Sequence, residues 1–253
     1  MRLLRRGKEI DLAHTRVGLR KIYIDSEVYI YLNGNKLFQR LVLDQGYWQD
    51  SGLTPPSAEA LKKDIEISKA MGFNGARKHQ KFEDPYFYYY AEELGFLTWC
   101  EMPSAYTFCA SEVKTVTKEW MDIVREARNF TSVIPYAPLN ESWGAREMKT
   151  RKGQQNFARS LYYLTKSIDS TRLVSTNDGF ENIDDSDILS IHDYHIKFAA
   201  EFPVKYKNGE YDGLNPQGWA LFADGNKYKG QPVLLTEFGG LAFANAKEGE
   251  AWG

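Results

Sequence analysis

The sequence predicts an α/β fold, a (β/α)₈ barrel that is truncated after its seventh strand and follows a short antiparallel β segment. Strand-like apolar runs alternate with helix-like periodic segments, which is the order typical of a parallel sheet. Seven such units occur in a chain of 253 residues, close to the roughly 250 residues of a typical barrel. No eighth strand is predicted after Gly239, so we expect the barrel to lack its last strand.

The strands are located by apolar runs and by polarity that alternates with a period of two. Residues 17–24 and 27–33 alternate like antiparallel strands, with Asn33-Gly34 as a turn. The barrel strands are then expected at residues 37–43, 73–77, 96–102, 133–139, 173–176, 188–191 and 233–236.

The helices between these strands are located by their caps and their apolar spacing. Ser57 is expected to cap a helix that stops at Gly72, and Pro85–Leu94 is expected to form a short helix that stops at Gly95. Ser111 is expected to cap the next helix. The apolar stripes of the last two helices are Val113, Val116, Trp120, Ile123, Val124 and Ala127, and then Phe157, Leu161, Leu164 and Ile168.

Two domains are expected. Residues 1–36 are interpreted as the end of a preceding β domain with its linker, and residues 37–253 as the barrel, incomplete at its C-terminus. An open barrel exposes a sheet edge and loses one wall of its pocket. We therefore expect this chain to be less stable and much less active than a longer parent, which thermal melts and turnover of the two lengths would test.

Composition and charge exclude several classes of protein. The chain has 32 Lys+Arg and 34 Asp+Glu, a net charge of −2, without the basic excess of nucleic-acid binders or of polybasic membrane-surface proteins. No apolar run is long enough for a transmembrane helix. Two cysteines, Cys100 and Cys109, do not make a disulfide framework and indicate a reducing, cytoplasmic setting; a signal peptide lost with a missing N-terminal part is the alternative.

Polar and aromatic side chains follow the predicted barrel strands. The C-terminal ends of the strands carry the chemistry in such barrels, so these residues are the candidates for a site. They are Asp44, Gln45, Tyr47 and Trp48; Arg77, Lys78 and His79; Glu101; Asn140, Glu141 and Trp143; Asn177 and Asp178; His192, Asp193, Tyr194 and His195; and Glu237.

Two carboxylates stand out in this set, Glu141 and Glu237. Each directly follows an apolar strand, and the fourth and seventh strands face each other across a barrel. Hydrolysis of a glycosidic bond with retention needs two such groups, a nucleophile and an acid/base. A strand-end carboxylate that caps the next helix is the alternative for either residue alone.

Four segments resemble the catalytic TIM barrel of glycoside hydrolase family 2, which includes β-galactosidases, β-glucuronidases and β-mannosidases. They are GFNGARKHQ (72–80), LGFLTWCEMP (94–103), RNFTSVIPYAPLNESWG (128–144) and LLTEFGG (234–240), and they occur in the family's order. Residues 17–24 look like the end of the immunoglobulin-like sandwich that precedes this barrel in the family.

The resemblance implies a role for each matching residue. Glu141 would be the acid/base, with a raised pKa, and Glu237 the nucleophile that forms the glycosyl-enzyme intermediate. Asn140 would bind the sugar 2-hydroxyl, Arg77 would help to keep Glu237 charged, and Tyr194 would orient it. Further sugar-pocket candidates are His79, Glu101, Trp143, Asn177, Asp178 and His192, together with Trp48 at the end of the first strand.

The resulting hypothesis is a retaining exo-β-glycosidase, β-galactosidase-like, that acts on terminal β-linked sugars by double displacement. The alternatives are a non-catalytic carbohydrate-binding or inactive truncated barrel fragment, and an endo-acting β-glycanase with the same two carboxylates. A carbohydrate is the expected partner, with no nucleic acid and no membrane; a homo-oligomer is left open. No cofactor and no metal are expected, since His192 and His195 on an extended segment point to opposite faces.

Overall fold

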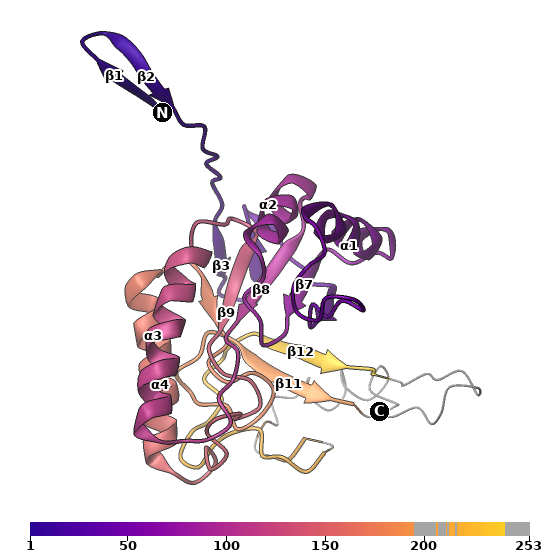
Figure 1. The fold of residues 1–253 in the computed structure, drawn as a ribbon. Helices are drawn as coiled ribbons and strands as arrows, with labels where there is room; N and C mark the ends of the chain where they lie inside the picture. Colours follow the sequence, from indigo (N-terminus) through magenta and orange to yellow (C-terminus); the bar gives the residue numbers. More distant parts are fainter. Residues whose placement is uncertain (195–205, 207–210, 212, 216, 241–253) are drawn as a thin grey trace.

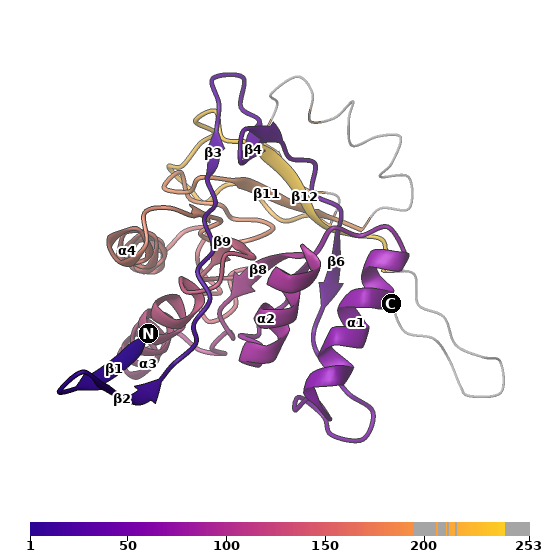
Figure 2. The same cartoon turned by 90° about the horizontal axis from the view of Figure 1, so that it is seen from above.

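The computed structural model describes residues 1–194, 206, 211, 213–215 and 217–240. Its centre is a five-stranded parallel sheet with the order β10-β9-β8-β7-β6. A separate parallel pair, β11-β12, lies on the side of this sheet away from the helices (Figures 1 and 2). The strands are β6 (Leu41–Asp44), β7 (Gly75–Lys78), β8 (Leu97–Glu101), β9 (Val133–Ala137), β10 (Leu173–Val174), β11 (Leu189–Asp193) and β12 (Val233–Phe238).

The α/β class and the parallel sheet are confirmed, and the seven strands lie where the apolar runs predict them. Several bounds differ from the expected ones. The first strand begins at Leu41 rather than at residue 37, because Leu41 is the first residue to pair with the neighbouring strand, at Gly75. These seven strands form two parallel sheets, joined where the amide of Asp187 donates to the carbonyl of Val174 at 2.9 Å.

Four helices pack on the outer side of the five-stranded sheet: α1 (Ala58–Ala70), α2 (Pro85–Leu94), α3 (Ala110–Ala127) and α4 (Lys152–Ile168) (Figure 2). Ser57 caps α1 as predicted, since its side chain accepts a hydrogen bond from the amide of Ala60 at 3.2 Å. The Ser111 cap is wrong. Helix α3 begins at Ala110, so Ser111 lies within its first turn and Cys109 occupies the cap position.

The N-terminal region contains two antiparallel units. A hairpin that the sequence did not predict, β1 (Arg2–Arg5) and β2 (Lys8–Leu12), stands away from the rest of the chain (Figure 1). The second unit is β3 (Ile22–Ile24), β4 (Ile30–Leu32) and β5 (Asn35–Lys36). Its turn at Asn33-Gly34 is confirmed, with φ of 52° and 82°, although its strands are shorter than the predicted runs.

Both faces of the five-stranded sheet are covered. Between the sheet and the helices lies the main core, which includes Leu61, Phe87, Trp120 and Leu161. On the other face a second cluster joins the small N-terminal sheet to the strands through Ile22, Ile30, Trp99, Ile134, Leu173 and Ile188. Because the faces are apolar and buried, polar side chains gather at the C-terminal ends of the strands. None of the helices in the described part of the chain has the length and apolar content to cross a bilayer.

Candidate active site

Arg77, at the end of β7, lies at the centre of the polar cluster and is 2% exposed. Its Nε donates to Oε2 of Glu101, its Nη1 to Oε1 of Glu237 and its Nη2 to Oδ1 of Asn140, each at 2.7 Å. Nη1 also lies 3.2 Å from Oδ2 of Asp178. One guanidinium thus joins the ends of four other strands, because its planar fork offers donors in several directions.

Charge pairing explains how these groups are accommodated without solvent. Burial by itself lowers the pKa of Arg77, but the charges of Asp178, Glu101 and Glu237 outweigh it and raise the pKa. Burial raises the pKa of Asp178, but Arg77 and His192 outweigh it and hold that pKa well below its usual value. Arg77 therefore stays a cation and Asp178 an anion beneath the site.

The two candidate catalytic carboxylates converge from opposite sides of the cluster. One ligand atom each from Glu141, His192 and Glu237 lie within 4.8 Å of one another. The side chain of Glu237 is 6% exposed, whereas that of Glu141 is 26% exposed. Glu237 is held on both oxygens, because Arg77 donates to Oε1 and the hydroxyl of Tyr194 donates to Oε2.

His192, on β11, bridges the two carboxylates. Its Nδ1 lies 2.7 Å from Oε1 of Glu141, and its Nε2 lies 3.3 Å from Oε1 of Glu237. Burial lowers the pKa of His192, but the neighbouring carboxylates of Asp178, Glu141 and Glu237 outweigh it and raise the pKa to about 9. Burial raises the pKa of Glu141, yet the hydrogen bond and charge of His192 outweigh it and lower the pKa. The raised pKa expected for Glu141 is therefore wrong, because a cationic imidazole faces it.

The backbone that carries Glu141 is strained and held in place. Glu141 and Ser142 have φ of 49° and 53°, a conformation that costs free energy for residues other than glycine. The amide of Glu141 donates to the carbonyl of Asp178 at 2.9 Å, and that of Ser142 donates to Oδ1 of Asn177 at 3.0 Å. The hydroxyl of Ser142 donates to Oε2 of Glu181 at 2.6 Å. Asn177 is thus a buried support of this loop.

The remaining candidates lie around or outside this cluster. Nδ1 of His79 lies 3.0 Å from Oε1 of Glu101 and 3.8 Å from Oε1 of Glu237. Trp143 is half-buried, and the guanidinium of Arg146 lies 3.3 Å from the centroid of one of its rings. Trp48 packs against the main core, and its buried indole nitrogen has no hydrogen-bond partner in the described structure. Its place in the sugar pocket stays a prediction.

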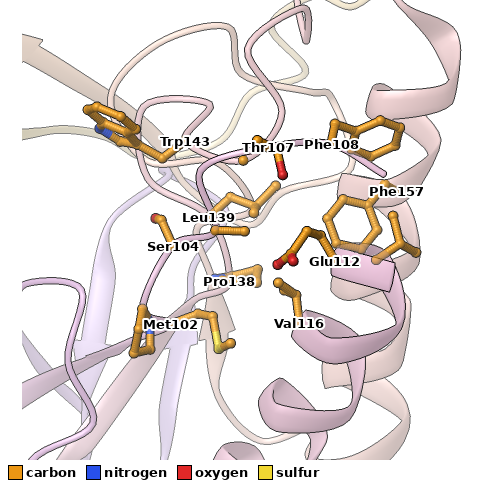
Figure 3. Close-up of a pocket in the computed structure, with 14 residues that line it drawn as sticks. Met102, Ser104, Thr107, Phe108, Glu112, Val116, Pro138, Leu139, Trp143 and Phe157 are labelled. Carbon is orange, nitrogen blue, oxygen red and sulfur yellow. The ribbon is translucent and has the colours of Figure 1, made fainter. Parts of the chain in front are cut away.

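A small apolar hollow lies beside this site (Figure 3). It is formed by the loop after β8, the end of β9 and the facing sides of α3 and α4, with Met102, Leu139 and Phe157 among its lining residues and Trp143 at one end. None of the paired charged residues lines it, so the hollow does not mark the site of the chemistry.

Glu141, His192 and Glu237 are also the three residues that could converge on a cation, within the ranges that the structure describes. Both imidazole nitrogens face carboxylates, and Arg77 already contacts Glu237, so the protein's own cations neutralise this cluster. His195, the other histidine of the sequence motif, lies outside the described residues.

Sequence reasoning missed two residues of the site. Ser142 and Glu181 form the hydrogen bond that supports the Glu141 loop. Ser142 follows Glu141 directly and could have been identified from its place in the Asn-Glu-Ser segment. Glu181 follows Asp178 by three residues in a loop with no motif, and no sequence signal marks it.

Comparison with known proteins gives matches in sequence and in fold, although no family profile matches the chain. The chain is 27% identical over 193 residues to a Formosa agariphila protein that carries the provisional name beta-glucuronidase, covering 74% of this chain and 23% of that protein. The chain thus spans about a quarter of the length of this curated relative.

Solved structures share the fold at lower identity. A Bacteroides fragilis structure with the provisional name beta-galactosidase matches with a TM-score of 0.75 and 22% identity, covering 96% of this chain and 34% of that one. A glycosyl hydrolase family 2 member from Bacteroides cellulosilyticus matches with a TM-score of 0.61 and 22% identity, covering 81% of this chain and 28% of that one. These matches bear out the resemblance to glycoside hydrolase family 2, and the chain is similar to proteins of that family along most of its length.

Proposed function

We propose that this chain forms the catalytic part of a retaining exo-β-glycosidase, in which Glu237 is the nucleophile and Glu141 the acid/base. The observation that carries the proposal is the approach of carboxylate oxygens of Glu141 and Glu237 to within 4.8 Å. Retaining glycosidases hold their carboxyl groups about 5–5.5 Å apart, whereas inverting ones leave about 6.5–9.5 Å for a water molecule.

The surroundings of each carboxylate suit these roles. Arg77 and Tyr194 each donate to a different oxygen of Glu237, which fixes the orientation of the attacking group. Glu141 is the more exposed carboxylate and can reach a leaving group that extends from the site. Asn140 accepts from Arg77 through Oδ1, so its amide nitrogen is the end that can donate to a sugar hydroxyl.

The reaction then proceeds in two balanced steps. An oxygen of Glu237 attacks the anomeric carbon, the glycosidic bond breaks, and a proton passes from Glu141 to the leaving oxygen. A water molecule next gives a proton to Glu141 and attacks the same carbon, which releases the sugar and restores the Glu237 carboxylate. A barrel kept only for binding has no need of this pair.

Two classes of terminal sugar are candidates. Arg77 and His192 each face carboxylates, so these two cations beside the catalytic pair are already neutralised, which favours a neutral sugar such as a β-galactoside. The printed name of the Formosa agariphila relative favours a β-glucuronoside. A glucuronoside brings its own carboxylate and would require a cation that is free to pair with it.

The same proposal extends to the architecture. We infer that the five-stranded sheet and the β11-β12 pair are consecutive parts of one barrel wall. The side-chain oxygens of Ser175 and Ser190 lie 3.2 Å apart between them, and the ends of β9 and β12 converge on the carboxylate pair. The domain boundary after residue 36 stays a prediction.

Trapping of the nucleophile tests the function. The protein is incubated with 2-deoxy-2-fluoro-β-glycosides of galactose, glucose, mannose and glucuronic acid, and its intact mass and labelled peptide are measured. We expect one stable adduct on Glu237, absent in Glu237→Gln, and the sugar that reacts fastest identifies the substrate class. An adduct on another residue, or none with any sugar, contradicts the proposal. Hydrolysis of oligosaccharides with a blocked non-reducing end would instead indicate the endo-acting alternative.

A further inference from the structure

The position of His192 suggests more than a contact with the sugar. Its ring touches both candidate catalytic carboxylates, through Nδ1 at 2.7 Å from Glu141 and through Nε2 at 3.3 Å from Glu237. Both protein carboxylates that would change charge in the reaction therefore lie beside this one imidazole. The residue is 1% exposed, so bulk water does not separate it from either partner.

The fold provides a specific place for this ring. A Cβ atom on Gly179, whose φ is +106°, would lie 2.5 Å from the imidazole, so the absence of a side chain there makes room for it. Phe180 packs edge-on against the ring, with 6.3 Å between centroids. The pairing of β11 with β12 shifts between Ile191 and His192, which brings His192 opposite Glu237. A side chain held in this way has a fixed orientation toward both carboxylates.

The chemistry of the partners determines where the protons lie. An ionised carboxylate can only accept a hydrogen bond, so a proton on Nδ1 fits the short contact with Glu141. Around Nε2 the facing groups are Glu237, Asp178 at 3.8 Å and Nη1 of Arg77 at 3.4 Å. Two carboxylates and one guanidinium on this side, with Glu141 on the other, favour the doubly protonated ring, in agreement with the raised pKa of His192.

We propose that His192 stores, on Nδ1, the proton which Glu141 delivers to the leaving group. This inference rests on the proposed function. It differs from a positioning role, since the ring gives up a proton and regains it during each turnover.

The proton balance runs through both steps. As Glu237 bonds to the anomeric carbon and the glycosidic bond breaks, the proton on Nδ1 passes to Glu141 and from it to the leaving oxygen, which leaves His192 neutral. As water attacks the intermediate, its proton passes through Glu141 back to Nδ1, and Glu237 leaves as a carboxylate. The bond that Glu237 forms also removes its negative charge from beside Nε2. The loss of this charge favours release of the proton in the step that uses it.

Nitrogen-15 NMR of the wild-type protein tests the storage directly. The chain has four histidines, and His192→Asn assigns the signal, with exposed His14→Asn as the matched control. We expect a doubly protonated His192 at pH 7 in the free protein. In the 2-fluoro-glycosyl adduct its titration midpoint should fall by about 1–3 pH units, because the neighbouring charge is gone. A neutral ring at pH 7, or a midpoint that the adduct leaves unchanged, overturns the inference.

Leaving-group dependence supplies the second test. A 2,4-dinitrophenyl glycoside needs no proton to leave, whereas a phenyl glycoside does. In His192→Asn, the ratio of the phenyl to the dinitrophenyl rate should fall by about 100-fold or more, as in Glu141→Gln, while His14→Asn keeps the wild-type ratio. The His192→Asn/Glu141→Gln double variant should lose no more than either single variant.

These outcomes separate the inference from the function on which it rests. An asparagine amide can still donate to Glu141, so a residue with a purely positioning role would keep the wild-type ratio in His192→Asn, and that result overturns the inference. If the Glu237 adduct forms while His192→Asn keeps this ratio, the glycosidase proposal stands and the proton store is refuted. If no adduct forms with any sugar, both are refuted.

Discussion

Replacing Arg77 with methionine keeps an unbranched side-chain stem and removes the cation that contacts three carboxylates. The guanidinium nitrogens of Arg77 lie 2.7 Å from Glu101, 3.2 Å from Asp178 and 2.7 Å from Glu237. The side chains of these three carboxylates are 0%, 0% and 6% exposed. Loss of one partner from a buried ion pair costs about 3–5 kcal/mol, because an uncompensated charge stays buried. We therefore expect Arg77→Met to lower the unfolding free energy at pH 7 by about 3–5 kcal/mol and Tm by roughly 6–20 °C.

The pKa of Asp178 determines how the stability loss of Arg77→Met depends on pH. In the wild type, the folded-state pKa of Asp178 is lowered: burial raises it, but Arg77 outweighs burial. This carboxylate therefore contributes stability that is present above its unfolded pKa of about 3.9 and is lost as the pH falls through the folded value. Without the charge of Arg77, less opposes the effect of burial on Asp178, and the folded-state pKa of Asp178 rises. The deficit of the variant should be largest at neutral pH and should shrink toward pH 4.

Urea unfolding at pH 7 and pH 5 measures this deficit. Arg16→Met is the matched control, since Arg16 also contacts two carboxylates, Glu92 at 2.9 Å and Glu93 at 3.0 Å, but is 41% exposed. An exposed pair of this kind contributes about 0–1 kcal/mol, so the control should stay close to the wild type. A loss below about 1 kcal/mol for Arg77→Met at pH 7, or a deficit that grows on acidification, would refute the reasoning.

Three further predictions concern the loop support, an acid-sensitive contact and the core. Ser142→Ala removes the 2.6 Å hydrogen bond to buried Glu181 and should cost about 1–3 kcal/mol in urea unfolding and lower kcat; an unchanged kcat would contradict a support role. Asp169 has a pKa lowered to about 2, because hydrogen bonds from neighbouring side chains and a cation outweigh burial. Asp169→Asn should therefore lose about 2–3 kcal/mol at pH 7, and melts should show the difference vanish as the pH falls from 4 toward 2. Leu61→Ala, at a position 1% exposed, should cost about 2–5 kcal/mol, and Ile67→Ala, at one 47% exposed, far less; equal losses would be inconsistent with the core assignment.

Local signals predict the helices well where the residues themselves stop or start the helix. The Pro85–Leu94 helix is confirmed at both ends, since proline suits the first turn and Gly95, with φ of 63°, takes the left-handed conformation. The Asn33-Gly34 turn is confirmed for the same kind of reason. The prediction that Ser111 caps α3 is wrong, since Cys109 occupies the cap position and makes no side-chain cap hydrogen bond.

Strand bounds depend on partners that lie far along the chain. The apolar run at residues 37–43 predicts a strand, but only Leu41–Asp44 finds a neighbour in β7. The run at residues 173–176 likewise pairs with β9 only through Leu173 and Val174. Because a strand exists only by pairing, the apolar run indicates its presence and the neighbouring strand decides its length.

The sequence by itself determined which side chains stand at the ends of the strands. An acidic, amide or basic residue directly after an apolar run is visible without a structure, and so is the pair of Glu141 and Glu237. The tertiary structure decided which of these groups touch. Arg77 and Glu237 are 160 residues apart in sequence and 2.7 Å apart in space. His192, a sugar-pocket candidate by sequence, lies between both carboxylates and reverses the pKa direction expected for Glu141. The physical reason is that electrostatic interactions depend on distance and burial, which no local pattern contains.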